Sequence, residues 1–77
     1  MSNRAVLRGI IKLKLEARLL PIEDARRRWA GPGNGEVCSA CDEAITKKQV
    51  LQEWDCDGVK VYMHIDCYEL WNSMRSR

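Results

Sequence analysis

The stretch CSACDEAITKKQVLQEWDCDGVKVYMHIDC, residues 38–67, begins and ends with a pair of residues that can bind a metal ion. Cys38 and Cys41 are separated by two residues, and so are His64 and Cys67. With this spacing, a tight turn or the first turn of a helix directs both side chains of a pair to one point. Zinc in structural sites takes four such ligands in a tetrahedron. We therefore predict one structural zinc ion, bound by Cys38, Cys41, His64 and Cys67.

Between the two pairs the sequence predicts a β-hairpin. Val50–Trp54 and Val59–Met63 have the composition of short strands, and they flank the dipeptide Asp57-Gly58. Asp-Gly favours a hairpin turn because both residues tolerate positive φ. The residues from His64 onward fit a C-terminal helix. The first cysteine pair would lie on a short loop, called a knuckle in zinc fingers. The order of knuckle, hairpin and helix is typical of a treble-clef-like zinc finger.

The predicted site has a structural rather than a catalytic pattern. Cysteine or histidine fills all four ligand positions, so no position is open for a reacting water. His64 is the only histidine, and the Gly31–Gly35 loop lacks the Lys-Ser/Thr of a phosphate-binding loop. We therefore expect no enzyme and no small-molecule substrate. Structural zinc contributes about 10–16 kcal/mol in finger peptides, so we expect residues 36–77 to lose their fold when zinc is removed.

The cysteines could instead form disulfides, which require an oxidising compartment and an export signal. The apolar stretch Ala5–Leu20 is interrupted by five charged residues, so it has no continuous signal-peptide core. It is also too short and too charged to span a membrane. We therefore expect a cytoplasmic protein with reduced thiols and no membrane partner, which favours the metal.

Cys56 is the one cysteine outside the two pairs. It is interpreted as a hairpin-turn residue without a further role; the alternatives are a replacement ligand for His64 or a redox-sensitive thiol. The charges of Asp55 and Asp57 should raise its pKa and lower its reactivity.

The residues before the knuckle predict two helices. The first covers Ala5–Leu20 and ends at Pro21, and the second runs from Pro21 to about Trp29, before the Gly31–Gly35 link. The first helix has two adjacent apolar rows. One row contains Val6, Ile10, Leu13, Ala17 and Leu20, and the other contains Leu7, Ile11, Leu15 and Leu19.

The predicted fold class is therefore a small α+β protein, with two N-terminal helices followed by a treble-clef-like zinc finger. Residues 1–35 form a basic helical segment and residues 36–77 form the Cys3His zinc-finger module, together one folded unit. The first segment has eight Lys/Arg and three Asp/Glu, a net charge of +5, and the second has five and eight, a net charge of −3.

The basic segment suggests binding of nucleic acid. Arg26, Arg27 and Arg28 could contact phosphates, and Trp29 could stack on an exposed base. In the alternative interpretation, the arginines stabilise a helix end and Trp29 packs under the Gly31–Gly35 loop.

Binding of a protein partner is the alternative function. The wide apolar surface of the first helix would bind a partner helix or a second copy of the chain. It could equally cover the core of the zinc module itself, in which case Val6, Ile10, Leu13 and Leu20 would be buried.

Three runs carry a resemblance to a family of short, uncharacterised bacterial zinc-binding proteins: RLLP…RRRWAGPG, GPGNGEVCSACDEAITKKQ and VYMHIDCYELW. The similarity covers nearly the whole chain and implies the same four zinc ligands, but no activity. More distantly, the C-x-x-C knuckle, Ile45, and the H-x-x-C followed by Tyr68 resemble the zinc fingers of poly(ADP-ribose) polymerases. Those fingers recognise DNA ends and breaks, whereas residues 36–77 are acidic here. The first half-site of LIM domains, which bind proteins, is similar too.

Overall fold

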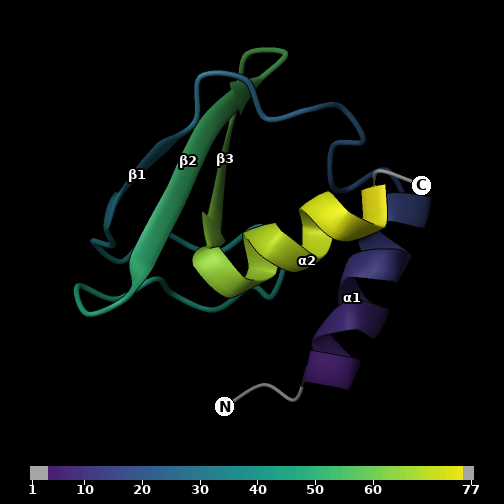
Figure 1. The fold of residues 1–77 in the computed structure, drawn as a ribbon, viewed down its shortest axis with the longest axis horizontal. Helices are drawn as coiled ribbons and strands as arrows, with labels where there is room; N and C mark the ends of the chain where they lie inside the picture. Colours follow the sequence, from purple (N-terminus) through teal and green to yellow (C-terminus); the bar gives the residue numbers. More distant parts are fainter. Residues whose placement is uncertain (1–3, 76–77) are drawn as a thin grey trace.

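The computed structural model of this chain describes residues 4–75 (Figure 1). The predicted segments 1–35 and 36–77 include three residues at the start and two at the end that lie outside the described residues. Neither helix among the described residues is long and apolar enough to cross a bilayer. The elements are α1 at Arg4–Glu16, β1 at Trp29–Pro32, β2 at Val50–Cys56, β3 at Val59–His64 and α2 at Ile65–Arg75.

The prediction of two N-terminal helices is wrong. Residues 21–28 contain no helix, and Trp29–Pro32 forms β1, which pairs antiparallel with β2. An isolated helix shorter than about 12–15 residues is marginal in water, so tertiary contacts can override a local helical preference.

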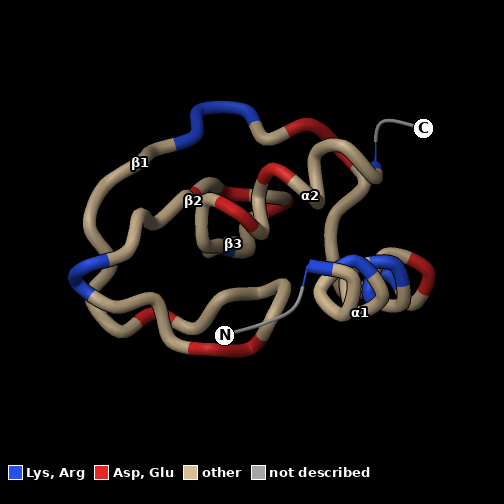
Figure 2. The backbone as a smooth tube through the Cα atoms, turned by 60° about the horizontal axis from the view of Figure 1, so that its bottom comes forward, with Lys and Arg blue, Asp and Glu red and all other residues tan. Residues whose placement is uncertain are grey.

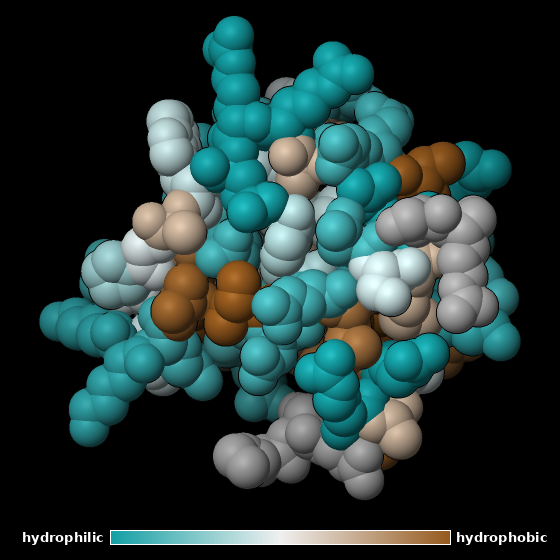
Figure 3. All heavy atoms as spheres, in the orientation of Figure 1, coloured by the Kyte–Doolittle hydropathy of each residue, from teal (hydrophilic) through white to brown (hydrophobic). Residues whose placement is uncertain are grey.

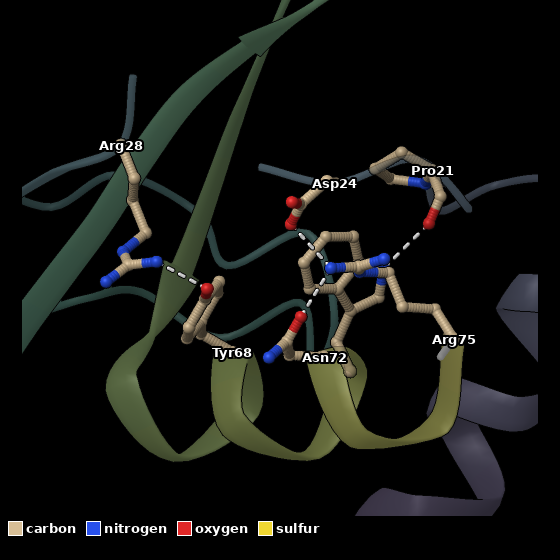
Figure 4. A network of polar contacts seen from close by, with 7 residues as sticks. Pro21, Asp24, Arg28, Tyr68, Asn72 and Arg75 are labelled. Carbon is tan, nitrogen blue, oxygen red and sulfur yellow. Dashed lines mark hydrogen bonds and ion pairs between the residues drawn. The ribbon is translucent and has the colours of Figure 1, made fainter. Parts of the chain in front are cut away.

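The contacts that replace the second helix come from α2 (Figure 4). The carbonyl of Pro21 accepts a hydrogen bond of 2.7 Å from Nε1 of Trp71. The carboxylate of Asp24 forms an ion pair of 2.6 Å with the guanidinium of Arg75. These contacts hold the segment 21–28 along α2. Asp24 pairs with a residue of α2 and does not stabilise the N-terminus of a second helix.

The first helix also ends earlier than predicted, at Glu16 rather than near Leu20. Arg18 adopts a left-handed conformation with φ of 60°, and the N–H of Leu19 donates to the carbonyl of Lys14 at 2.8 Å. A left-handed residue with such a bond is a common end for a helix. The turn brings Leu20 into the core, where only 3% of it is exposed.

α1 lies beside α2 and packs through the row that contains Leu7 and Ile11, both of which are buried (Figure 1). In the other row, Val6 and Leu13 are 57% and 67% exposed. The interpretation that Val6 and Leu13 cover the core is therefore wrong, although Leu20 does so.

The three strands of the described chain form an antiparallel sheet in the order β1-β2-β3. The hairpin of β2 and β3 turns at Asp57 and Gly58, with φ of 50° and 82°, as the Asp-Gly dipeptide predicts. Trp54 packs from β2 against α2, with its ring centroid 5.0 Å from that of Trp71. The hairpin and the C-terminal helix thus form where the sequence predicts them.

Among the residues that the structure describes, the buried apolar side chains form a single core cluster that includes two of the predicted zinc ligands. Its members come from α1, the sheet, α2 and the loops between them. They are Leu7, Ile11, Leu20, Cys38, Ala40, Ile45, Leu51, Trp54, Val61, Met63, Cys67, Leu70 and Trp71.

Candidate metal centre

The first pair of predicted ligands lies on a tight loop, residues 37–44, which we call the knuckle. The N–H of Cys38 donates to the carbonyl of Glu43, and the N–H of Asp42 donates to the carbonyl of Cys38, both at 2.9 Å. Asp42 takes a φ of 66°, a conformation that aspartate tolerates better than most residues. These bonds fold the loop back on itself, so that the sulfurs of Cys38 and Cys41 lie close together.

The second pair lies at the junction between β3 and α2. His64 is the last residue of β3, and Cys67 belongs to the first turn of α2. The N–H of Ser39 donates to the carbonyl of Tyr62 at 2.7 Å, which joins the knuckle to β3. The knuckle is thereby held against the start of α2, and all four predicted ligands meet.

The distances between the ligand atoms fit one tetrahedral metal ion. The three sulfurs and the histidine nitrogen all lie within 4.8 Å of one another. Nδ1 of His64 is 3.4 Å from Sγ of Cys41 and 3.9 Å from Sγ of Cys67. A tetrahedral zinc with ordinary bond lengths separates sulfur and nitrogen by ~3.6 Å. Cys38, Cys41, His64 and Cys67 are thus positioned to bind a metal ion.

The surroundings of His64 select the nitrogen that faces the sulfurs. Nε2 lies 3.3 Å from the carbonyl oxygen of Ala44 and 3.1 Å from Oε1 of Gln49, and both atoms are acceptors. Oε1 of Gln49 also accepts the N–H of Thr46 at 2.9 Å, which fixes the orientation of the amide. Nε2 must therefore carry the proton, and the lone pair of Nδ1 is directed to the metal position. Metal-binding histidines almost always have such an outer partner.

Sequence reasoning missed Gln49. It lies in the polar run from Thr46 to Gln49, and nothing in its spacing relative to the four ligands distinguishes it from its neighbours. Its role depends on the loop that brings it beside His64, 15 residues away in the chain.

The three thiols do not ionise equally. A hydrogen bond from Cys67, more than any other contact, lowers the pKa of Cys38 to about 4. The same bond, and then burial, raises the pKa of Cys67, and burial raises the pKa of Cys41. The protein groups alone therefore favour one thiolate and two thiols. A divalent cation would supply the positive charge that ionises the other two, as thiolate ligation requires. No disulfide joins the four cysteines, all of which lie within residues 4–75.

α1 covers one side of this centre. Leu7 lines a pocket of about 480 Å³ together with Cys41, His64 and Cys67. Nζ of Lys14 donates to the carbonyl of Ser39 at 2.9 Å and pairs with the carboxylate of Asp42 at 2.8 Å. The N-terminal helix is thus tied to the knuckle.

Cys56 lies at the opposite end of β2 from this pocket, within 4.8 Å of carboxylate oxygens of Glu23 and Asp57. Burial, followed by the charges of Asp57 and Glu23, raises the pKa of its thiol. The predicted direction is confirmed, although Glu23 takes the place of the expected Asp55. Cys56 is far in the fold from the four ligands and contributes nothing to their geometry.

Of the four residues predicted to bind nucleic acid, one is bound to α2. Arg28 donates to the hydroxyl of Tyr68, and its guanidinium lies 4.3 Å from the centre of that ring (Figure 4). Arg26 and Arg27 are exposed. Trp29 is 67% exposed, so the alternative that it packs under the Gly31–Gly35 loop is wrong.

Comparison with known proteins gives no match to a protein-family model, a curated protein or a solved structure. The resemblance to short bacterial zinc-binding proteins and to other zinc fingers stays a prediction. Functional proposals for this chain rest on its own residues.

Proposed function

We propose that this chain is a zinc-stabilised module that binds nucleic acid. Three thiolates and one imidazole at tetrahedral distances are a donor set that suits zinc. With four protein ligands, the ion would stabilise the fold and leave no position for a reacting water. We therefore assign the site a structural role and the chain a binding role.

The observation that carries nucleic-acid binding is the placement of Arg26 and Arg27. Both are exposed, and neither has an ion pair or hydrogen bond to another residue of the described range. Figure 2 shows the run of basic residues directly before β1. Such unpaired cations can neutralise phosphates and release counterions. The exposed ring of Trp29 beside them suits stacking on a base.

The test is the salt dependence of binding of a labelled single-stranded oligonucleotide to the zinc-loaded chain. Each phosphate contact contributes a slope of about −0.7 in log K against log salt. We expect the double variant Arg26→Gln/Arg27→Gln to bind more weakly and to reduce the slope by about 1.4. Lys47→Gln/Lys48→Gln removes the same charge from the loop before β2 and should change the slope less.

Two outcomes contradict the proposal. The first is a wild-type protein that shows no salt-dependent binding even at low salt. The second is an equal loss of affinity and of slope in the two double variants. That result would mean that binding depends on net charge and not on the position of Arg26 and Arg27.

A second candidate, binding of a protein partner, is favoured by α1. Val6 and Leu13 remain exposed on the side of the helix away from Leu7 and Ile11. On the face drawn in Figure 3, apolar side chains form small patches separated by hydrophilic ones. If α1 mediates self-association, the wild type should sediment as a dimer and Leu13→Ser as a monomer. A wild type that is monomeric at all concentrations removes self-association.

A further inference from the structure

A pocket of about 350 Å³ lies beside the start of β1. Its volume falls in the range of ordinary small-ligand sites, about 300–1,000 Å³. We call it the Trp29 pocket. It is lined by Arg26, Arg27, Trp29, Trp54, Asp55 and Lys60.

The pocket exists because the chain leaves the sheet just before β1. Trp29, the first residue of β1, pairs with Glu53 of β2. β2 continues past this pair through Trp54 and Asp55, which have no pairing partner in β1. The guanidinium of Arg28 packs over the ring of Tyr68 in α2, and Arg27 takes a positive φ of 51°. The backbone before Trp29 therefore turns away from β2 and leaves the pocket between them.

Trp29 forms an aromatic wall of this pocket. Nζ of Lys60 lies 5.7 Å from the centre of its ring. The same ammonium pairs with Glu53 at 3.1 Å and with Asp55 at 3.6 Å. Lys60 is thus held against the ring by two carboxylates and its charge is largely neutralised. Trp29 as a residue remains 67% exposed, which leaves surface for a planar ligand.

Trp54 forms the buried side of the lining. Its side chain is only 2% exposed, and its ring packs against Trp71 of α2. The pocket therefore combines an aromatic surface at Trp29 with two unpaired cations, Arg26 and Arg27.

We propose that the Trp29 pocket binds one unpaired nucleotide of a single-stranded nucleic acid. The base stacks on Trp29, and Arg26 and Arg27 contact the flanking phosphates. The proposal rests on the nucleic-acid function above and adds the form that is recognised. A base inside a duplex is already stacked on its neighbours, so it cannot present its face to Trp29.

The experiment compares a labelled single strand with the same strand in a blunt duplex, using the zinc-loaded full chain. We expect the single strand to bind more tightly and to quench tryptophan fluorescence. Trp29→Ala should weaken single-strand binding about five- to 150-fold, the loss of one base stack. Trp29→Phe keeps an aromatic ring and should retain most of the wild-type affinity for the single strand. The matched control Leu19→Ala removes a side chain that is 70% exposed outside the pocket, and it should bind like wild type.

If the single strand and the duplex bound with equal affinity, and Trp29→Ala left that affinity unchanged, base binding in the Trp29 pocket would be overturned. Binding of nucleic acid by Arg26 and Arg27 would still stand. Failure of the wild type to bind either probe at low salt would overturn both proposals.

Discussion

The two ring nitrogens of His64 have different surroundings, and this difference gives Gln49 its importance. Nδ1 faces the sulfurs, while Nε2 donates to Ala44 and Gln49. Because the Gln49 amide is itself fixed by Thr46, it holds the imidazole in both tautomer and orientation.

We expect Gln49→Ala to lower zinc affinity. Loss of an outer partner of a metal-binding histidine typically reduces metal affinity about 10–100-fold. Competition with a chromophoric chelator measures the change, and Lys47→Ala, an exposed substitution in the same loop, is the control. An affinity in Gln49→Ala equal to that of wild type would mean that the backbone of Ala44 alone orients His64.

Gly33 is required by a close approach of two backbone segments. A Cβ at this position would lie 2.4 Å from the carbonyl oxygens of both Ile45 and Thr46. We expect Gly33→Ala to reduce the free energy of unfolding of the zinc-loaded protein by about 1–3 kcal/mol, as overpacking does. Gly9→Ala is the matched control, since a Cβ there meets nothing within 4 Å and glycine is a poor helix former. That variant should be more stable by about 0.5–1 kcal/mol. If chemical denaturation gave the same change in the free energy of unfolding for Gly33→Ala and Gly9→Ala, the steric requirement for glycine at position 33 would be contradicted.

At the scale of elements, α1 presents two apolar rows of similar composition, of which only one is buried. Ile11 is fully buried and Leu13 is 67% exposed. We expect Ile11→Ala to cost about 2–5 kcal/mol of the free energy of unfolding, and Leu13→Ala to change it by about 0.5 kcal/mol or less. Denaturant titration of the zinc-loaded variants measures both. A larger loss in Leu13→Ala would show that the other row packs on the core.

The segment 21–28 shows how tertiary contacts redirect a local preference. Glu23 and Asp24 near its start and three arginines near its end complement a helix dipole. In the fold, Asp24 instead pairs with Arg75, and Arg28 binds Tyr68. Two of the charges that predicted a helix, Asp24 and Arg28, thus fasten a non-helical segment to α2.

At the scale of the whole molecule, a metal ion at the four ligands would join three separate parts of the fold. A 77-residue chain buries only about 60% of its unfolded surface, and the knuckle, β3 and α2 meet at the four ligands. We expect one zinc per chain in native mass spectrometry, and loss of the hairpin and α2 signals after chelation. Cys56→Ser should keep its zinc, because Cys56 lies outside the ligand group, whereas Cys67→Ser should lose most of it. Hairpin and helix signals that survive full chelation would rule out a structural role for the metal.

The sequence by itself determined the ligand group and the hairpin turn. Ligand pairs two residues apart, and an Asp-Gly dipeptide that tolerates positive φ, act within a few residues of chain. The tertiary structure alone decided which row of α1 is buried, the conformation of residues 21–28, and the role of Gln49. These outcomes depend on distant partners: the donor and acceptor that fasten Pro21 to Trp71 are 50 residues apart in the chain. Local propensities differ by only fractions of a kcal/mol per residue, so such distant contacts outweigh them.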